Sequence, residues 1–281
     1  MISFHENGWT VFVRGDIKNM SETEAKQVGR YVASNMVVVF PDQYKQTPDD
    51  QIRFTNMIGR YNSLEDLPVN KRERYSNILI RDGVARVTGA LNEKGEPGLF
   101  GHVSELDWHA NQASNRERKP IVWMYGDSGM EGSRTSFINM IQVYKDLPPD
   151  LKEKISNKKC YFGYKKGKYS TSPYFHEHVN KDNLFDLVMT NRAGKTGLYY
   201  PFNQVFGMAD TSEKEFFDLH EVLKHFILKE KYVYHHDWKD NQIVLCDQWL
   251  SLHKRWKFDK MEDRMLHRIA FDYSNIYEKY P

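Results

Sequence analysis

The feature that most constrains the fold is a series of short apolar segments, separated by turn signals, that begins near residue 75. SNILI, ARVTGAL and IVWMYG are each of strand length, and the turn-forming stretches EKGEPG and DSGMEG follow the second and the third. Short strands with glycine-containing turns between them are typical of antiparallel sheets. QIVLCDQ and HRIAFDYS repeat the pattern near the C-terminus. Most of the chain is therefore predicted to be antiparallel β-structure.

Helices are predicted on either side of these strands, each at a start signal with a physical basis. A serine or threonine at such a position accepts a hydrogen bond from a backbone N–H of the first helical turn, and proline fits the first helical position. The predicted helices cover 25–33 after the Ser21 and Glu24 pair, 51–58 after Thr47 and Pro48 with Gly59 at the end, and about 211–232. Residues 36–40, MVVVF, predict a buried strand between the first two helices.

The fold class predicted from these elements is mostly β with flanking helices, as in a sandwich, a barrel or a double-stranded β-helix (jelly roll). We expect one domain over residues 1–281, with residues 1–70 packing on the core as helices and a strand. An irregular stretch begins near residue 145. Long irregular segments often carry function.

The amino-acid composition argues against several classes of function. The 40 basic and 38 acidic residues give a net charge of +2, too balanced to predict binding to nucleic acid. The lysine- and tyrosine-rich segment 158–169 could contact a phosphate backbone, but lysines that protect a sheet edge explain it better. Cys160 and Cys246 form no metal or disulfide motif, and no apolar run approaches the about 18 residues of a membrane span. These features predict a cytoplasmic protein without a membrane segment.

Two of the 11 histidines are candidate metal ligands. Residues two apart on a strand share a face, so the His-x-Asn sequence of His109 and Asn111 could hold one metal ion. His253, in LSLHKRW, would supply the second imidazole from a distant strand. Two histidines and one further oxygen ligand leave positions open for oxygen chemistry. His176 and His178 have the spacing of a metal pair, but no pattern places a third ligand beside them, and a surface turn is the better reading.

In its motifs the sequence resembles the taurine dioxygenase/TfdA-like family of iron(II)- and 2-oxoglutarate-dependent oxygenases. The family pattern runs from a His-x-Asp/Glu pair through Thr or Ser to a distant His and then Arg. His109, Thr135, His253 and Arg264 match it in order and spacing, and MVVVFPDQ is similar to the family's entry segment. Asp247 is similar to an aspartate that precedes the second histidine in the family.

The resemblance implies a role for each matched residue. His109 and His253 would bind iron(II), and Arg264 with the hydroxyl of Thr135 would bind the far carboxylate of 2-oxoglutarate. Arg268 corresponds to an arginine that contacts the substrate anion in the sulfonate-binding member, although a structural ion pair explains it equally well. The family places its lid and substrate loops in the interval that corresponds to residues 160–200. The expected reaction is hydroxylation of an unactivated carbon of a small substrate, coupled to decarboxylation of 2-oxoglutarate to succinate, and Arg268, if it faces the pocket, favours an anionic substrate.

Asn111 is the departure from the family, which has a carboxylate there. A neutral amide binds iron(II) more weakly and leaves the site one charge more positive. The amide could still act as a ligand, chloride could bind as in the related halogenases, or metal binding could be lost in a non-catalytic relative. Asn is larger than the Ala or Gly of the halogenases, which argues against chloride. The nearby carboxylate of Asp107 would reach the metal only if its strand bends.

Other classes of protein remain as rivals. A nucleic-acid-binding module would need a dominant basic face, which the charge balance does not support. A cupin-like isomerase or a metal-dependent hydrolase could use the same histidines, but it would give no role to Thr135 and Arg264. The identity of the substrate and a homo-oligomeric state are left open.

Overall fold

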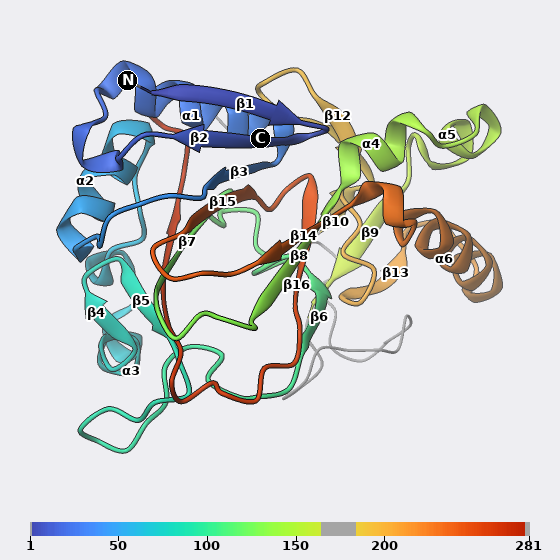
Figure 1. Cartoon of the computed structure of the whole chain (residues 1–281). Coiled ribbons are helices and arrows are strands. Elements are labelled where there is room, and N and C mark those ends of the chain that lie inside the picture. The colour runs from blue at the N-terminus through green and yellow to red at the C-terminus, as the bar shows by residue number, and fades with distance from the viewer. Residues whose placement is uncertain (1, 164–183, 279–281) are drawn as a thin grey trace.

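The computed structural model describes residues 2–163 and 184–278 of the chain. In this part, strands form four sheets and helices flank them, so the prediction of a mostly β fold with flanking helices is confirmed at that level (Figure 1). The two larger sheets face each other and position the site described below.

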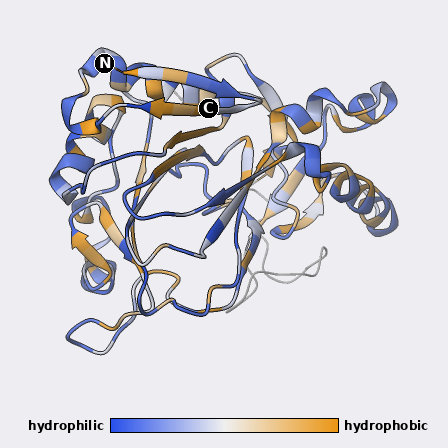
Figure 2. Cartoon of the chain, in the orientation of Figure 1, coloured by the Kyte–Doolittle hydropathy of each residue, from blue (hydrophilic) through white to orange (hydrophobic). Residues whose placement is uncertain are grey.

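The major sheet has eight strands in the order β1-β2-β3-β15-β7-β17-β5-β4. Its pairs are antiparallel except for the parallel pair β2 and β3, so the N-terminal strands extend the sheet. Strand β3 is buried throughout, as the run of β-branched residues predicts, and Figure 2 shows β3 and β15 coloured as hydrophobic. The strands are β1 Ser3–Asn7, β2 Thr10–Arg14, β3 Val37–Phe40, β4 Leu79–Arg81, β5 Val84–Val87, β7 Ile121–Ser128, β15 Ile243–Asp247 and β17 Met265–Phe271.

The minor sheet has four antiparallel strands in the order β14-β8-β16-β6. One hydrophobic cluster contains Val122, Met124 and Leu266 from the major sheet and Phe137 from the minor sheet, so this cluster lies between the two sheets. The strands are β6 Leu106–His109, β8 Arg134–Asn139, β14 Val233–Asp237 and β16 Ser251–Arg255.

Two helices cover the other face of the major sheet. The first is α1 Glu22–Asn35, and the second is α2 Pro48–Ile58. Helix α1 begins with the predicted capping box of Ser21 and Glu24, and α2 begins at the predicted N-cap Thr47, which also forms a capping box with Asp50. Gly59 ends α2 as predicted, and a side chain there would meet the backbone carbonyl of Asp272.

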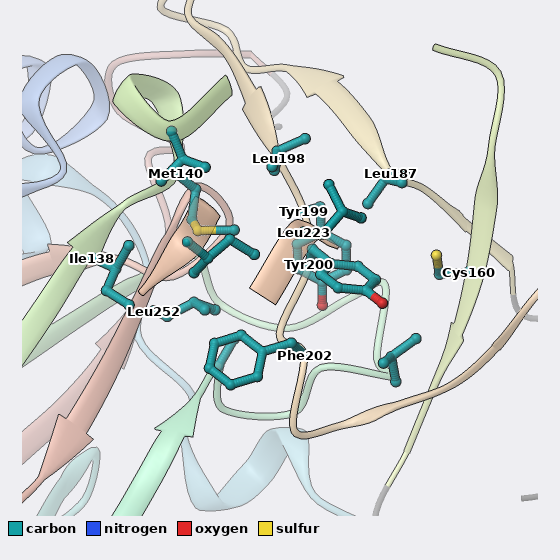
Figure 3. Packing of buried hydrophobic residues seen from close by; sticks show 14 of the residues in the cluster. Ile138, Met140, Cys160, Leu187, Leu198, Tyr199, Tyr200, Phe202, Leu223 and Leu252 are labelled. Atoms are coloured by element: carbon teal, nitrogen blue, oxygen red, sulfur yellow. The ribbon is translucent and has the colours of Figure 1, made fainter. Parts of the chain in front are cut away.

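A third group of elements packs against the end of the minor sheet. It includes α6 Glu213–Ile227, which begins at a capping box of Ser212, close to the predicted start. The predicted end near Tyr232 is wrong, because the helix ends at Ile227 and residues 230–232 form the separate short helix η3. Figure 3 shows Tyr199, Tyr200 and Leu223 in the hydrophobic cluster that joins α6 to the neighbouring strands. The other elements are α4 Met140–Lys145, α5 Pro149–Ile155, β9 Lys159–Phe162, β10 Leu184–Asp186, β11 Val188–Thr190, β12 Thr196–Leu198 and β13 Val205–Met208.

Short elements complete the described part of the chain. Helix α3 has no side-chain cap and buries no residue, and the sequence pattern did not predict it. No described helix is long and apolar enough to cross a membrane. These elements are η1 Ile17–Asn19, η2 Leu64–Asp66, α3 Val69–Ser76 and η3 Glu230–Tyr232.

The two cysteines are buried, and the described lysines of the lysine- and tyrosine-rich segment contact neighbouring side chains. Cys160 and Cys246 are buried and unpaired as disulfides, and burial raises the pKa of both thiols. Lys158 donates to the hydroxyl of Thr211, and Lys159 forms an ion pair with Asp186 on the neighbouring strand. The rest of the lysine- and tyrosine-rich segment, from residue 164, and both His176 and His178 lie outside the described residues.

Candidate active site

A small pocket of about 50 Å³ lies between the two large sheets. We call it the inner pocket. The six residues expected from the sequence to bind metal, cosubstrate or substrate, His109, Asn111, Thr135, His253, Arg264 and Arg268, all line it, and no acidic side chain among the described residues does. Its lining residues are Val87, Phe100, Leu106, His109, Asn111, Val122, Met124, Thr135, His253, Arg255, Arg264, Leu266 and Arg268.

The two histidines come together because strands β6 and β16 pair. His109 and His253 are direct partners in the ladder, and their ring centroids are 4.2 Å apart. Nδ1 of His109 lies 2.6 Å from the backbone carbonyl of Asp107 and donates to it, which leaves Nε2 as the nitrogen with a lone pair. Burial lowers the pKa of His109 to about 4 and that of His253 well below its ordinary value. Both rings are therefore neutral, as a metal ligand must be.

A bulge in β6 decides which side chains face the inner pocket. His253 pairs with His109, but Arg255, two residues on, pairs with Leu106, three residues back. The extra residue puts Leu106 and His109 on the same side, although simple alternation would separate them. Asp107 is turned away: its carboxylate accepts from the amide of Asn203 at 3.0 Å and lies 3.4 Å from the ammonium of Lys254. Asp107 does not line the inner pocket.

Asn111 follows the end of β6, and hydrogen bonds hold both its backbone N–H and its backbone carbonyl. Its N–H donates to the side-chain oxygen of Gln248, and its carbonyl accepts from Arg118. The Arg118 guanidinium also donates to the carbonyl of Gln248 and stacks over the ring of Trp249 at 4.0 Å. These contacts fix the position from which the Asn111 amide reaches Nε2 of His253, 3.1 Å away.

The turn between β15 and β16 positions His253. The buried carboxylate of Asp247 accepts from the backbone N–H groups of Trp249 and Leu250 and from the hydroxyl of Tyr273. This places Ser251 at the start of β16 and His253 in register with His109. Nδ1 of His253 is buried without a hydrogen-bond partner among the described residues.

Thr135 lies on β8, on the side of the inner pocket opposite the major sheet. Its hydroxyl oxygen accepts from the indole N–H of Trp238 at 2.9 Å. Because the oxygen is already an acceptor in this contact, the hydroxyl hydrogen is available to donate to a ligand.

Arg264 provides a buried cation at the inner pocket. It lies one residue before β17, and both Arg264 and Arg268 line the pocket. Its side chain is 2% exposed and contacts the Met261 sulfur at 3.6 Å, and no carboxylate pairs with it among the described residues. Burial, with a smaller contribution from Arg255, lowers the pKa of Arg264 to about 9. A buried cation without a counter-ion is costly, so this pocket favours an anion.

Arg255 is a second buried arginine in the inner pocket. Its guanidinium donates to the backbone carbonyls of Phe100, His102 and Ser104. It therefore ties the loop 100–104 to strand β16. Sequence patterns did not indicate Arg255, because its contacts are with backbone atoms distant along the chain.

A larger pocket of about 380 Å³ adjoins the inner pocket. We call it the outer pocket. The two pockets share Phe100, Asn111 and Arg268. Arg268 pairs with Met124 on one neighbouring strand and with Ala85 on the other, so it lies at the boundary of the two pockets. Within 160–163 and 184–200, no residue lines either pocket, and the lid expected at about 160–200 stays a prediction.

The side chains of the inner pocket fit a metal ion. Two ligands bound at right angles about 2.1 Å from an ion are about 3 Å apart, which is close to the 3.1 Å between His253 Nε2 and the Asn111 amide nitrogen. A half-turn of the amide exchanges its nitrogen for its oxygen at that position. No cluster of three His, Cys, Asp or Glu side chains that could hold a metal occurs in the described ranges, so a third protein ligand here would be Asn111.

Comparison with known proteins identifies the family. The model of the taurine catabolism dioxygenase TauD, TfdA family matches residues 11–270. The chain belongs to this family. It is thus a TauD/TfdA-family 2-oxoglutarate-dependent dioxygenase, and the family uses iron(II) with 2-oxoglutarate. A curated relative, pentalenolactone F synthase of Streptomyces avermitilis, is 22% identical over 278 residues, which cover 89% of this chain and 86% of that protein.

Solved structures support the fold of this dioxygenase. AAD-2 in complex with Mn(II) and N-oxalylglycine superposes with a TM-score of 0.74 at 20% identity, and the match covers 96% of each chain. A taurine dioxygenase from Burkholderia xenovorans gives a TM-score of 0.73 at 16% identity, over 96% of this chain and 89% of that one. At these identities the likeness concerns the fold.

Proposed function

We propose that this TauD/TfdA-family dioxygenase hydroxylates an unactivated carbon of a small anionic substrate. In the balanced reaction, the substrate C–H, dioxygen and 2-oxoglutarate give the C–OH product, succinate and carbon dioxide. We further propose that the two facing sheets are the double-stranded β-helix of the predicted jelly-roll core.

In this proposal, iron(II) is held by His109, His253 and the amide oxygen of Asn111. Bound iron(II) supplies the centre at which dioxygen is activated as 2-oxoglutarate loses carbon dioxide. The neutral histidines offer lone pairs without first losing a proton. The contacts of Gln248 and Arg118 with the Asn111 backbone limit the movement of the third ligand.

Arg264 and Thr135 would orient 2-oxoglutarate. The planar guanidinium of Arg264 can bind the far carboxylate through two N–H groups, and the hydroxyl of Thr135 can donate to the same carboxylate. Val87, Val122 and Leu266 line the same pocket and exclude water from it. Arg268 would meet the anionic group of the substrate where the pockets join.

A single observation carries the proposal: a buried arginine without a carboxylate partner among the described residues lines the same pocket as two neutral, paired histidines. A structural ion pair would account for neither feature. A metal-dependent isomerase or hydrolase would use the histidines but would not need the buried cation.

Anaerobic titration with iron(II) and 2-oxoglutarate tests the proposal through the visible charge-transfer band of the chelate. We expect a saturable band in the unmodified chain. In Arg264→Gln we expect on the order of 10–100-fold weaker 2-oxoglutarate binding, because a charge-assisted contact worth about 1.5–3 kcal/mol is lost. Binding of Mn(II) alone should stay within about threefold of the unmodified chain, because the metal ligands are unchanged.

Arg192→Gln, at an exposed arginine outside both pockets, is the control and should leave the band unchanged. Equal 2-oxoglutarate affinity in Arg264→Gln and the control would refute the role of Arg264. Absence of any band at high metal and cosubstrate would show that Asn111 has disabled the site. Repeating the titration with chloride tests the halogenase alternative, which requires a chloride-dependent shift of the band.

A further inference from the structure

The outer pocket has a lining that differs from that of the inner pocket. Apart from Arg268, no side chain that lines it among residues 2–163 and 184–278 carries a full charge. Polar groups come from a few uncharged residues, among them Asn62, Gln112 and Gln248. The rest of the wall is dominated by apolar side chains, which are Leu64, Leu67, Tyr75, Ile78, Leu79, Ala85, Leu99, Phe100 and Ala270.

Part of this apolar wall, namely Leu64, Leu67 and Tyr75, lies on or beside elements that are not packed into the protein core. Neither η2 nor α3 has a buried residue, and α3 has no side-chain cap. Leu64 and Leu67 are only half-buried, and Tyr75 is 39% exposed. Apolar side chains gathered in a concave surface that no other described residue covers are typical of a ligand site.

The size of the outer pocket limits its ligand. A volume of about 380 Å³ would hold roughly a dozen water molecules at about 30 Å³ each. It falls within the usual range of small-molecule sites. A substrate of only a few heavy atoms would bind at Arg268 and leave most of the apolar wall exposed to water.

We infer that the substrate is an amphiphilic monoanion, whose apolar body of about ten heavy atoms packs against the segment 62–79 while its anionic group meets Arg268. This inference rests on the proposed function, because it places the substrate beside the proposed metal ligands. One guanidinium, in a wall to which the described part of the chain contributes no acidic side chain, selects one negative charge. The apolar body determines which anions bind, and Leu64 and Leu67 are specificity-determining residues.

The charges on the two elements beside the apolar wall largely balance. Helix α3 carries Lys71, the half-buried Arg72 and Arg74 against the single acid Glu73, and the adjoining η2 carries Glu65 and Asp66. Arg72 donates to the carbonyls of Leu67 and Glu65, so it holds η2 against α3. The preference for an anion therefore rests on Arg268 and not on a field around the wall.

A chain-length series tests the inference with defined probes. Butyrate, hexanoate, octanoate and the neutral octan-1-ol are titrated calorimetrically into the whole protein, loaded anaerobically with iron(II) and 2-oxoglutarate. We expect affinity to rise by about two- to fourfold for each methylene from butyrate to octanoate, because each one is removed from water. Octan-1-ol should bind about tenfold or more weakly than octanoate, because it lacks the charge that Arg268 pairs with.

Substitutions in the apolar wall of the outer pocket test whether this wall causes the rise in affinity with chain length. In the double variant that combines Leu64→Ser with Leu67→Ser, the increase in affinity per methylene should fall toward onefold, while the affinity for butyrate is unchanged. Leu228→Ser replaces a leucine that is 41% exposed at the end of α6, outside both pockets, and should keep the full increase. Affinity that does not change with chain length, or a full increase in the double variant, would overturn the inference.

The same samples separate this inference from the proposed function. The charge-transfer band reports iron(II) and 2-oxoglutarate, and calorimetry reports the outer pocket. A normal band with no dependence on chain length refutes only the amphiphile. Loss of the band with the dependence retained refutes only the oxygenase site.

Discussion

At the scale of the residue, Asn111 sets the charge of the proposed metal site. Its amide is next to Nε2 of His253, at a distance that suits two ligands of one ion. The order and spacing of His109, Asn111 and His253 could be read from the sequence, because a strand places alternate residues on one face. The supports of Asn111 could not, since Gln248 and Arg118 act through backbone groups and follow no spacing rule.

Replacing Asn111 with Asp is expected to tighten metal binding. The carboxylate adds a negative charge at a position that the amide already occupies, so Mn(II) affinity should rise on the order of 10–100-fold. Calorimetric titration of Mn(II) measures the effect. Gln112→Glu adds the same charge one residue away, at an exposed side chain of the outer pocket, and should change the affinity by about twofold at most. Equal gains in both variants would mean that Asn111 does not contact the metal.

At the scale of the element, caps and contacts determine what a sequence pattern can predict. Helices α1, α2 and α6 were predicted because each has an N-cap residue at its start and apolar residues at helical spacing. Helix α3 has neither a side-chain cap nor a buried residue, so its sequence carries no helical periodicity to detect. The position of the loop 100–104 was likewise not predictable from a sequence pattern, since it depends on Arg255 from a strand about 150 residues away.

Arg255→Met should release that loop. The variant keeps an apolar stem but loses the N–H groups that donate to three backbone carbonyls, so we expect about 2–3 kcal/mol lower stability. Hydrogen exchange of residues 100–104 should become faster. Arg134→Met, which removes an exposed ion pair with Asp237 on the neighbouring strand, should cost less than about 1 kcal/mol. Unchanged exchange in the loop of Arg255→Met would contradict its role in holding this wall of the pockets.

At the scale of the whole molecule, the site depends on strands that are far apart in the sequence. The mostly β class with flanking helices was predictable from local patterns. The strand order was not, because it depends on long-range pairs such as β16 with β6 and β17 with β5. The site forms only when both sheets are assembled, since His109 and His253 come from one sheet and Arg268 from the other.

Buried histidines should make the stability of the whole fold depend on pH. Burial lowers the pKa of His220 and of His236 to about 4. The unfolded chain takes up these protons near pH 6.5, so between pH 6.5 and 4 it binds more protons than the folded chain. The free energy of unfolding should therefore be highest above pH 6.5 and fall toward pH 4, by up to about 1.4 kcal/mol per pH unit for each histidine.

Urea unfolding of the metal-free protein at pH 7.5 and at pH 5 measures this dependence. His220→Gln keeps a side chain that can bond to the hydroxyl of Tyr200 and should reduce the difference between the two pH values. His225→Gln, at an exposed position on the same helix, should leave the difference as in the unmodified chain. If both variants behave alike, the protonation of His220 is not linked to unfolding.

The bulge in β6 has a consequence for how such a site can change. Two polar side chains flank His109 at equal distance along the chain; the extra residue in the ladder sends Asp107 to Lys254 on the outside, whereas Asn111, beyond the end of the strand, faces the interior. The formal charge beside the histidines therefore depends on which residues of this strand face inward, as well as on which amino acids the strand contains. If the bulge moved by one residue, a different side chain would face the histidines. The charge of the proposed metal site would then change, although the composition of the protein would not.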